Sequence, residues 1–245
     1  MDHPLDAQPS LHSMRVPFEG RELYADSLQA GKDAYALCIH GGGSKGSSVY
    51  REFRHFLFVH GIGSTALDCL GHERTGGNLE DSSLASREKQ ILTVVRHQAM
   101  TPTILVGASM GAYNAILLAQ RLGVRQLILV VPGIYTPRAF NVPFGPEFSA
   151  VIRRERSWVE SDAWLALGEF TGRLLVVAAE CDEVVPAEIP KKIISSACKA
   201  ESVQLLTIPG AKHNGLLPKI LNSAEGVRAL ETCLRLDTAR GQAFA

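Results

Sequence analysis

Short runs of almost continuous apolar residues alternate with helix-like segments along most of the chain, and this alternation constrains the fold more than any other feature. Six runs are predicted to be strands: residues 34–40, 64–69, 101–108, 124–131, 173–180 and 202–210. Helical spacing is found between or after them, at residues 48–61, 83–98, 111–123, 188–200 and 223–236. Strands that are apolar throughout are typical of a parallel sheet with both faces buried. The sequence therefore predicts an α/β protein with a mostly parallel central sheet and helices on both faces.

The N-terminal part of the chain does not follow this alternation. Residues 15–28 alternate weakly between apolar and polar about Gly20-Arg21, which predicts a β-hairpin. Residues 1–14 are rich in polar residues and proline, and we expect them to be a loose segment.

A second interruption comes at about residues 132–170, called the insertion below. It contains four prolines and a short charged and aromatic stretch at 148–158 that is predicted to be helical. Strand and helix patterns resume after it, and there is no repeat or low-complexity linker. The simplest organisation is one domain over residues 15–245 that carries this insertion.

Composition excludes several classes of protein. The 25 basic and 25 acidic residues cancel, and 46% of the chain is hydrophobic, so a nucleic-acid-binding stripe and a disordered chain are both disfavoured. No apolar stretch approaches the roughly 18 residues of a membrane span. The five cysteines are scattered and the N-terminus lacks a signal-peptide pattern, which favours free thiols in the cytoplasm. A surface without net charge also removes one barrier to self-association, so a homodimer remains open.

The stretch Gly107-Ala108-Ser109-Met110-Gly111 lies where a predicted strand gives way to a predicted helix. Glycines two residues either side of a serine allow a tight, strained turn that would expose the serine Oγ above the carboxyl edge of the sheet. Such a turn also directs the Met110 amide toward the same space. The motif is short, and a glycine-rich loop that only turns the chain is the alternative. Its place between strand and helix favours a nucleophilic serine.

A serine nucleophile needs a base and an orienting acid. Of the eight histidines, His213 is the best candidate, because it lies in a polar loop after the last strand and such a loop can return over the serine. Asp182 follows the strand at 173–180 and is the predicted acid, with Glu180 the second choice. The order serine, acid, histidine along the chain is the one expected for this architecture.

The oxyanion of a tetrahedral intermediate needs backbone donors. Residues 39–44 leave a strand with three successive glycines, whose N–H groups a ligand can approach without obstruction by side chains. We predict Gly42, Gly43 and Met110 as these donors. No cluster of His, Cys, Asp or Glu has ligand spacing, so neither a metal nor another cofactor is expected.

These motifs resemble those of the serine α/β-hydrolase family, and most closely its small single-domain esterase and acyl-peptidase-like branch. The likeness runs from about residue 15 to the last helix and also includes residues 67–77, 179–186 and 208–215. The resemblance implies an α/β-hydrolase fold, with Ser109 as nucleophile, Asp182 as acid and His213 as base. Many members carry Gly-His-Gly-x-Ser where this chain has Gly71-His72-Glu73-Arg74-Thr75, so the substrate pocket nearby can differ from theirs.

The insertion occupies the place of the lid in that family. Its aromatic residues could line a substrate pocket, and the residues we predict for this are Tyr135, Phe140, Phe144 and Trp158. The alternative is that they pack a short cap onto the sheet. Arg153, Arg154 and Arg156 are expected to lie on a solvated helix face.

The sequence thus predicts a serine hydrolase that cleaves a carboxylic ester, thioester or small amide of a small-molecule acyl substrate through an acyl-enzyme. Acyl transfer or carbon–carbon bond hydrolysis by the same triad is an open alternative, because the triad sets the mechanism and the pocket sets the substrate. A catalytically silent ligand-binding protein on the same scaffold is another.

Overall fold

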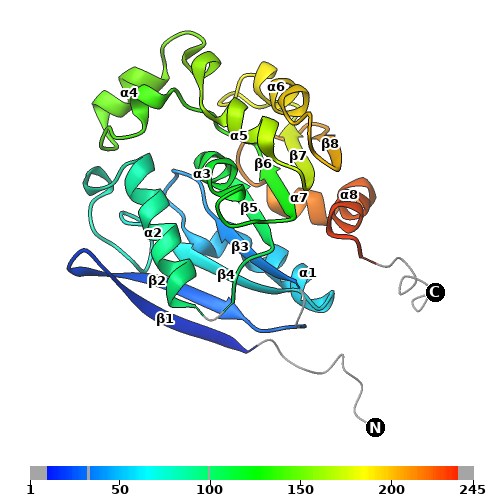
Figure 1. Ribbon diagram of the computed structural model, residues 1–245, viewed down its shortest axis with the longest axis horizontal. Coiled ribbons are helices and arrows are strands. Elements are labelled where there is room, and N and C mark those ends of the chain that lie inside the picture. The colour runs from blue at the N-terminus through cyan, green and yellow to red at the C-terminus, as the bar shows by residue number, and fades with distance from the viewer. Residues whose placement is uncertain (1–9, 32–33, 99, 237–245) are drawn as a thin grey trace.

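The computed structural model describes residues 10–31, 34–98 and 100–236, and its centre is one eight-stranded sheet (Figure 1). The strand order is β1-β2-β4-β3-β5-β6-β7-β8. The six strands β4, β3, β5, β6, β7 and β8 pair with their neighbours in parallel, whereas β2 is antiparallel to both β1 and β4. The strands are β1 Leu11–Phe18, β2 Arg21–Leu28, β3 Tyr35–Ile39, β4 Gly63–Asp68, β5 Ile104–Ala108, β6 Gln126–Val130, β7 Arg173–Ala179 and β8 Ser202–Ile208. The mostly parallel sheet predicted from the sequence is confirmed.

Helices cover both faces of this sheet. The α-helices are α1 Arg51–Val59, α2 Leu84–His97, α3 Met110–Ala119, α4 Pro146–Ile152, α5 Ala163–Glu169, α6 Glu188–Ser196, α7 Leu216–Leu221 and α8 Ala224–Leu234. Short 3₁₀ helices are η1 Ser47–Tyr50, η2 Leu79–Asp81, η3 Pro137–Ala139 and η4 Ser157–Glu160. One hydrophobic core lies between the sheet and α2, α3, α5 and α6, and a second lies between the sheet and α1, α7 and α8.

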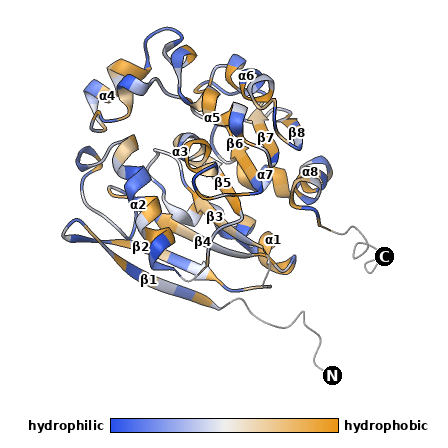
Figure 2. Cartoon of the chain, viewed as in Figure 1, coloured by the Kyte–Doolittle hydropathy of each residue, from blue (hydrophilic) through white to orange (hydrophobic). Residues whose placement is uncertain are grey.

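Alternate residues of each central strand enter the two cores. In β5, Leu105 belongs to the first core, while Ile104 and Val106 belong to the second. Successive side chains of a strand point to opposite faces, so both sets must be apolar when both faces are covered. This is why the central strands are almost uniformly hydrophobic in Figure 2, whereas the edge strand β1 is mixed.

The predicted hairpin is present, with a tight turn at Glu19 and Gly20. Their φ angles are +47° and +77°, as the favoured two-residue hairpin turn requires. The first strand begins at Leu11, so residues 11–14 pair with β2 and are not part of a loose segment as expected. Their side chains are mostly exposed, because β1 is an edge strand, and the burial pattern that marks a strand is therefore weak there. Residues 1–9 of the expected loose segment lie outside the described residues.

The insertion between β6 and β7 contains η3, α4, η4 and α5, and it runs along the top of the view in Figure 1. The helix predicted at 148–158 is interrupted, because α4 ends at Ile152 and Arg156 has a φ of +49°. The residues between them are exposed and charged, so no apolar stripe extends the helix. Helix α5 packs against α3 and α6 and thus joins the layer that covers the sheet.

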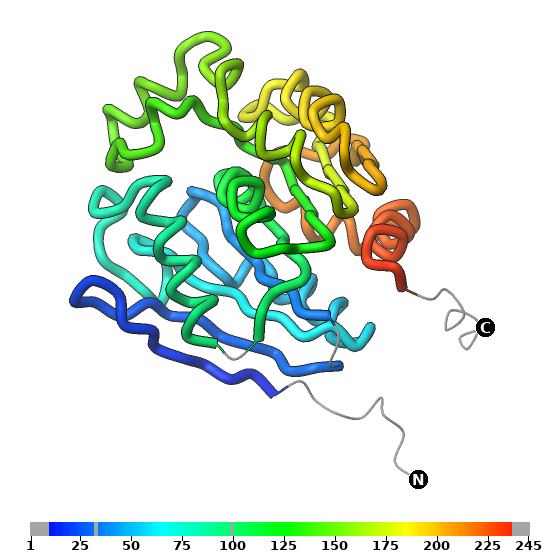
Figure 3. Tube along the Cα trace, viewed as in Figure 1, coloured from blue at the N-terminus to red at the C-terminus, as the bar shows by residue number. Residues whose placement is uncertain are grey.

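The N-terminal and C-terminal parts of the chain lie on opposite sides of β5 and α3. The N-terminal strands and the C-terminal elements flank the segment of β5 and α3 in Figure 3. Both are central in the sheet order, so residues at the carboxyl end of β5 can be reached by loops from both halves.

Candidate active site

The turn that joins β5 to α3, residues 107–111 and called the elbow below, holds Ser109 in an unusual backbone conformation. Its φ and ψ are +50° and −116°, a region that residues with side chains rarely adopt. Hydrogen bonds to the neighbouring strand and to the loop after it help to hold this conformation. The Ser109 N–H donates to the Val130 carbonyl at 2.9 Å, and the Gly133 N–H donates to the Ser109 carbonyl at 3.0 Å.

The two glycines of the elbow are required by close backbone contacts. A Cβ atom at Gly107 would lie 2.6 Å from the Ala112 Cα and 2.6 Å from the Gly111 carbonyl oxygen. A Cβ at Gly111 would lie 2.1 Å from the carbonyl oxygen of Ile39. The first glycine leaves room for the first turn of α3, and the second lets the helix approach β3.

The structure brings Ser109, His213 and Asp182 together from the ends of three strands. The His213 Nε2 lies 3.0 Å from the Ser109 Oγ. The other ring nitrogen, Nδ1, lies 3.1 and 3.0 Å from the two carboxylate oxygens of Asp182. An ionised carboxylate has no proton to donate, so in the neutral imidazole Nδ1 carries the proton and Nε2 is left to accept from the serine hydroxyl.

Local hydrogen bonds distinguish Asp182 from the neighbouring acids. Its Oδ1 accepts from the N–H groups of Val184 at 2.8 Å and Val185 at 2.9 Å, so the carboxylate is held by its own turn. Glu180 instead accepts from the Gly210 N–H at 2.7 Å, which ties the end of β7 to the loop that carries His213. Glu183 is exposed. Only Asp182 among the three is placed to orient the histidine.

The glycine loop after β3 lies against the elbow. A Cβ at Gly41 would lie 3.2 Å from the Ser109 Cβ, and one at Gly42 would lie 2.7 Å from the Met110 Cε. A Cβ at Gly43 would meet no atom within 4 Å. Of the three predicted donors, Gly42 and Met110 are therefore in contact at the elbow, whereas Gly43 lies further along an exposed part of the loop.

A buried histidine orients the peptide that contains the Gly42 N–H. The His40 Nε2 accepts from the Cys69 N–H at 3.0 Å, so its Nδ1 carries the proton and donates to the Gly41 carbonyl at 2.7 Å. In a trans peptide the C=O of Gly41 and the N–H of Gly42 point in opposite directions. Fixing this carbonyl therefore fixes the direction of the Gly42 N–H.

His40 is unsuited to act as a base. Burial, together with the positive charge of Arg87 and the neighbouring His72, lowers the pKa of His40 well below its usual range. The pKa of His72 is also lowered, by burial first and by Arg87 second. Both rings are buried and neutral, so they serve the structure around the glycine loop.

Two carboxylates to which the sequence analysis gave no role hold the next part of this loop. Asp68 is buried at the end of β4 and accepts from the Ser47 N–H at 2.6 Å. Glu73 accepts from the Ser48 N–H at 3.4 Å and from the Ser48 hydroxyl. Glu73 has a φ of +31°, a conformation that favours glycine. The departure from the Gly-His-Gly-x-Ser pattern thus replaces a glycine with a side chain that binds Ser48.

Comparison with known proteins identifies the family. The model of the alpha/beta hydrolase family matches residues 36–191, which is more than half of the chain. The chain belongs to the alpha/beta hydrolase family. No curated protein matches the sequence.

Solved structures of other proteins share the fold of this α/β hydrolase. A predicted CIB-like hydrolase from Thermoplasma acidophilum has a TM-score of 0.67 at 18% identity, over 93% of this chain and 99% of that one. The esterase Est1E from Butyrivibrio proteoclasticus, solved with ferulic acid, has a TM-score of 0.69 at 22% identity, over 91% and 98%. The Pyrococcus furiosus esterase Pf2001 has a TM-score of 0.70 at 17% identity, over 96% of each chain.

The aromatic residues of the insertion divide into two groups. Phe144 and Trp158, predicted to line a substrate pocket, are only 3% and 6% exposed and belong to the hydrophobic core. They pack the insertion onto the domain, which was the alternative interpretation. Tyr135 and Phe140 are partly buried and retain accessible surface.

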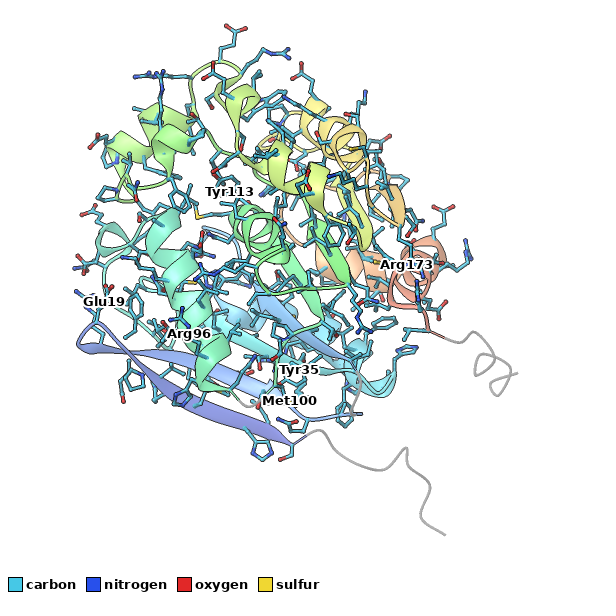
Figure 4. The ribbon with its side chains drawn as sticks, viewed as in Figure 1. Glu19, Tyr35, Arg96, Met100, Tyr113 and Arg173 are labelled. Atoms are coloured by element: carbon cyan, nitrogen blue, oxygen red, sulfur yellow. The ribbon has the colours of Figure 1, made fainter. Side chains whose placement is uncertain are left out.

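An aromatic series connects the insertion to α3. The Tyr113 ring meets the Tyr135 ring edge-on with centroids 5.4 Å apart, and Tyr135 lies 5.8 Å from Phe148. The Tyr113 hydroxyl also donates to the Asp162 carboxylate at 2.6 Å, and Figure 4 labels its side chain on the side of α3 toward the insertion. These contacts fix the insertion beside the helix that follows Ser109.

The described part of the chain has neither a candidate metal site nor a candidate membrane-spanning helix. Within it, no group of three or more His, Cys, Asp or Glu side chains could hold a metal ion. None of its helices is long and apolar enough to cross a bilayer. A cavity of about 220 Å³ borders Asp182, but neither Ser109 nor His213 lines it, so it is separate from the nucleophile.

Proposed function

We propose that this α/β hydrolase cleaves a carboxylic ester, thioester or small amide, with Ser109 as nucleophile, His213 as general base and Asp182 as orienting acid. The observation that carries the proposal is the continuous series of contacts from the Ser109 Oγ through both nitrogens of His213 to the Asp182 carboxylate. This is the geometry of a serine activated by a histidine whose tautomer is held by an acid.

In the first half of the reaction, the Ser109 Oγ attacks the carbonyl carbon of the substrate while its proton passes to the His213 Nε2. The resulting imidazolium is stabilised by the Asp182 carboxylate at Nδ1. The tetrahedral intermediate then breaks its bond to the leaving group, which takes the proton from Nε2. An acyl-serine and a free alcohol, thiol or amine result.

In the second half, a water molecule donates its proton to the His213 Nε2 and attacks the acyl carbon. The second tetrahedral intermediate breaks the bond to the Ser109 Oγ, which recovers the proton, and the carboxylic acid leaves. In both intermediates the negative oxygen would accept from the N–H groups of Gly42 and Met110. The start of α3 adds the partial positive charge of a helix N-terminus.

Two features bear on the substrate. The esterases named above are structural neighbours, which favours an ester over the other acyl compounds. Tyr135 and Phe140 are the predicted pocket residues that keep accessible surface, and we propose that they contact the acyl group.

The test is a fluorophosphonate label combined with a panel of p-nitrophenyl esters of rising acyl length. We expect the label on the peptide that contains Ser109 and loss of ester hydrolysis in proportion to labelling. The Ser109→Ala variant is the control and should be neither labelled nor active. Labelling at a different serine would refute the assignment of the nucleophile. A chain that binds esters without hydrolysing them or taking the label would be a silent binding protein.

A further inference from the structure

Arg87 of α2 is a completely buried arginine at the rear of the candidate active site. Its side chain is 0% exposed and is the largest fully buried side chain of the described residues. Its Nη2 donates to the His40 carbonyl, and its Nε donates to the Asn114 Oδ1 at 3.4 Å. Asn114 lies on α3 and donates in turn to the Leu84 carbonyl at 3.2 Å. Arg87 therefore links α2 to both the glycine loop and the helix that follows Ser109.

The positive charge of Arg87 has no carboxylate partner among the described residues. No Asp or Glu oxygen of that part of the chain lies within 4.0 Å of it, and its Nη1 is buried without a hydrogen-bond partner. A guanidinium does not lose its proton in a protein, and a buried unpaired charge is costly. The charge must therefore be retained at this place at the expense of stability.

A second buried arginine shows the usual arrangement. Arg54 of α1 is 5% exposed, and its Nη1 binds the Asp26 carboxylate while its Nε donates to the Ser64 hydroxyl at 3.0 Å. Its charge is neutralised within the network between α1, β2 and β4. Arg54 and Arg87 are thus a matched pair, one compensated and remote from Ser109, the other uncompensated and beside the glycine loop.

The His40 carbonyl, to which Arg87 donates, lies where the glycine loop meets the elbow. It belongs to the peptide unit between His40 and Gly41, and a Cβ at Gly111 would lie only 2.5 Å from its oxygen. The next peptide unit supplies the Gly42 N–H, and the His40 ring fixes that one. Arg87 and the His40 ring therefore hold two successive peptide units beside the elbow, the first between residues 40 and 41 and the second between residues 41 and 42.

We infer that Arg87 is a positioning residue for the oxyanion, an inference that rests on the proposed function. It holds the His40 carbonyl, so that the Gly42 and Met110 donors keep a fixed separation. Its uncompensated positive charge also favours the negative oxygen that exists only in the tetrahedral intermediates, because charge interactions are weakly screened in a buried site. The neutral ester gains little from this charge, so the effect falls on the chemical steps more than on substrate binding.

The experiment compares Arg87→Met, Arg87→Lys and Arg54→Met in the full-length chain. Active sites are counted with the fluorophosphonate, so that turnover refers to folded sites alone. We also measure the melting temperature and the affinity for an alkyl boronic acid, which forms a tetrahedral anion on a serine.

For Arg87→Met we expect kcat to fall roughly 30-fold, with KM within about twofold of the wild type. Boronic acid binding should weaken by a similar factor. The kcat and boronic acid affinity of Arg87→Lys should lie between those of the wild type and Arg87→Met, because lysine keeps the charge and loses the planar fork. Arg54→Met should lower the melting temperature, since it removes the ion pair with Asp26 and the hydrogen bond to Ser64, and leave kcat per titrated site unchanged.

Several results would overturn the inference. Wild-type kcat per titrated site in Arg87→Met would do so, as would a rise in KM at constant kcat or an equal loss of kcat in Arg54→Met. If Arg87→Met does not fold, a folded Arg87→Lys with unchanged kcat and boronic acid affinity would overturn it as well. A wild-type chain that hydrolyses no ester and takes no label would overturn the proposed function, whereas an active wild type beside an unimpaired Arg87→Met overturns this inference alone.

Discussion

The elbow and the insertion follow neighbouring strands, β5 and β6, at the same edge of the sheet, yet they are held in different ways. The elbow is fixed by backbone: Ser109 bonds to the strand and loop beside it, and its glycines touch carbonyl oxygens and Cα atoms. The insertion is held by two backbone hydrogen bonds, from the Phe144 N–H to the Ser82 carbonyl and from the Ala85 N–H to the Phe140 carbonyl, and otherwise mainly by buried aromatic side chains such as Phe144 and Phe148. Backbone contacts allow almost no variation, whereas packed side chains can be exchanged at a graded cost. The comparison suggests that chemistry is set at the elbow and substrate preference in the insertion.

The largest expected effect concerns the acid that orients His213. Asp182→Asn should keep the fold and Ser109 accessibility but lower turnover on the order of 10⁴-fold, because the amide cannot stabilise the imidazolium. Glu180→Gln and Glu183→Gln should each retain at least about a tenth of the turnover. The measurement is kcat on one good ester, with circular dichroism to confirm folding. A folded Asp182→Asn enzyme with near-normal turnover would remove Asp182 from the proposed mechanism.

The second prediction exchanges one glycine in each region for alanine. Gly111→Ala should lower the free energy of unfolding by about 3 kcal/mol, because its Cβ would lie 2.1 Å from the Ile39 carbonyl oxygen, and turnover should fall with it. Gly168→Ala in α5 has ordinary contacts, the nearest at 3.6 Å, and should stabilise the protein by about 0.5–1 kcal/mol, since glycine is unfavourable within a helix. Urea unfolding measures both. A tolerated Gly111→Ala would contradict the claim that backbone contacts leave no room at the elbow.

The third prediction separates packing from substrate choice within the insertion. Phe148 is 4% exposed, so Phe148→Ala should cost about 3 kcal/mol of stability and slow all esters by a common factor. Phe140 is only partly buried, so Phe140→Ala should cost less and alter relative rates across acyl lengths. The measurement is kcat/KM for each ester in the panel. If both variants slow all esters equally, both phenylalanines are structural.

The last prediction is a loss of stability at acid pH that begins near the elbow. His40 and His72 are neutral in the folded protein because their pKa values are lowered, whereas the unfolded chain takes up these protons below about pH 6.5. Stability is therefore full above that pH and falls as the pH decreases toward the folded pKa values, by up to about 1.4 kcal/mol per pH unit for each histidine.

Hydrogen exchange at pH 7 and pH 5 can locate this loss. The insertion contains no histidine, so protection should decrease around β3 and the glycine loop before it decreases in α4 and α5. The opposite order would show that the two buried histidines are not the acid-sensitive groups. His72→Asn, with one fewer neutral buried histidine, should flatten the dependence.

Local pattern was sufficient for much of the fold. The apolar runs predicted six of the eight strands, because a strand buried on both faces must be apolar along its whole length. The hairpin supplied the other two strands, and Ser83 caps α2 by accepting from the Ser86 N–H, at the serine where the helix was predicted to begin. The junction of strand, glycine and serine at Ser109 could also be located from sequence, because its geometry is made by adjacent residues. Helices α5 and α7 were not predicted, since each is too short to show a helical period.

Features that depend on contacts between residues far apart in the sequence were decided by the tertiary structure alone. Ser109 and His213 are 104 residues apart and meet at 3.0 Å, and the choice between Asp182 and Glu180 depended on which carboxylate a later loop approached. Burial of Phe144 and Trp158, the neutral state of His40 and the absence of a carboxylate beside Arg87 in the described chain likewise depend on what surrounds each side chain. A sequence pattern reports the preferences of neighbouring residues, whereas charge, burial and catalytic contact arise between residues that only folding brings together.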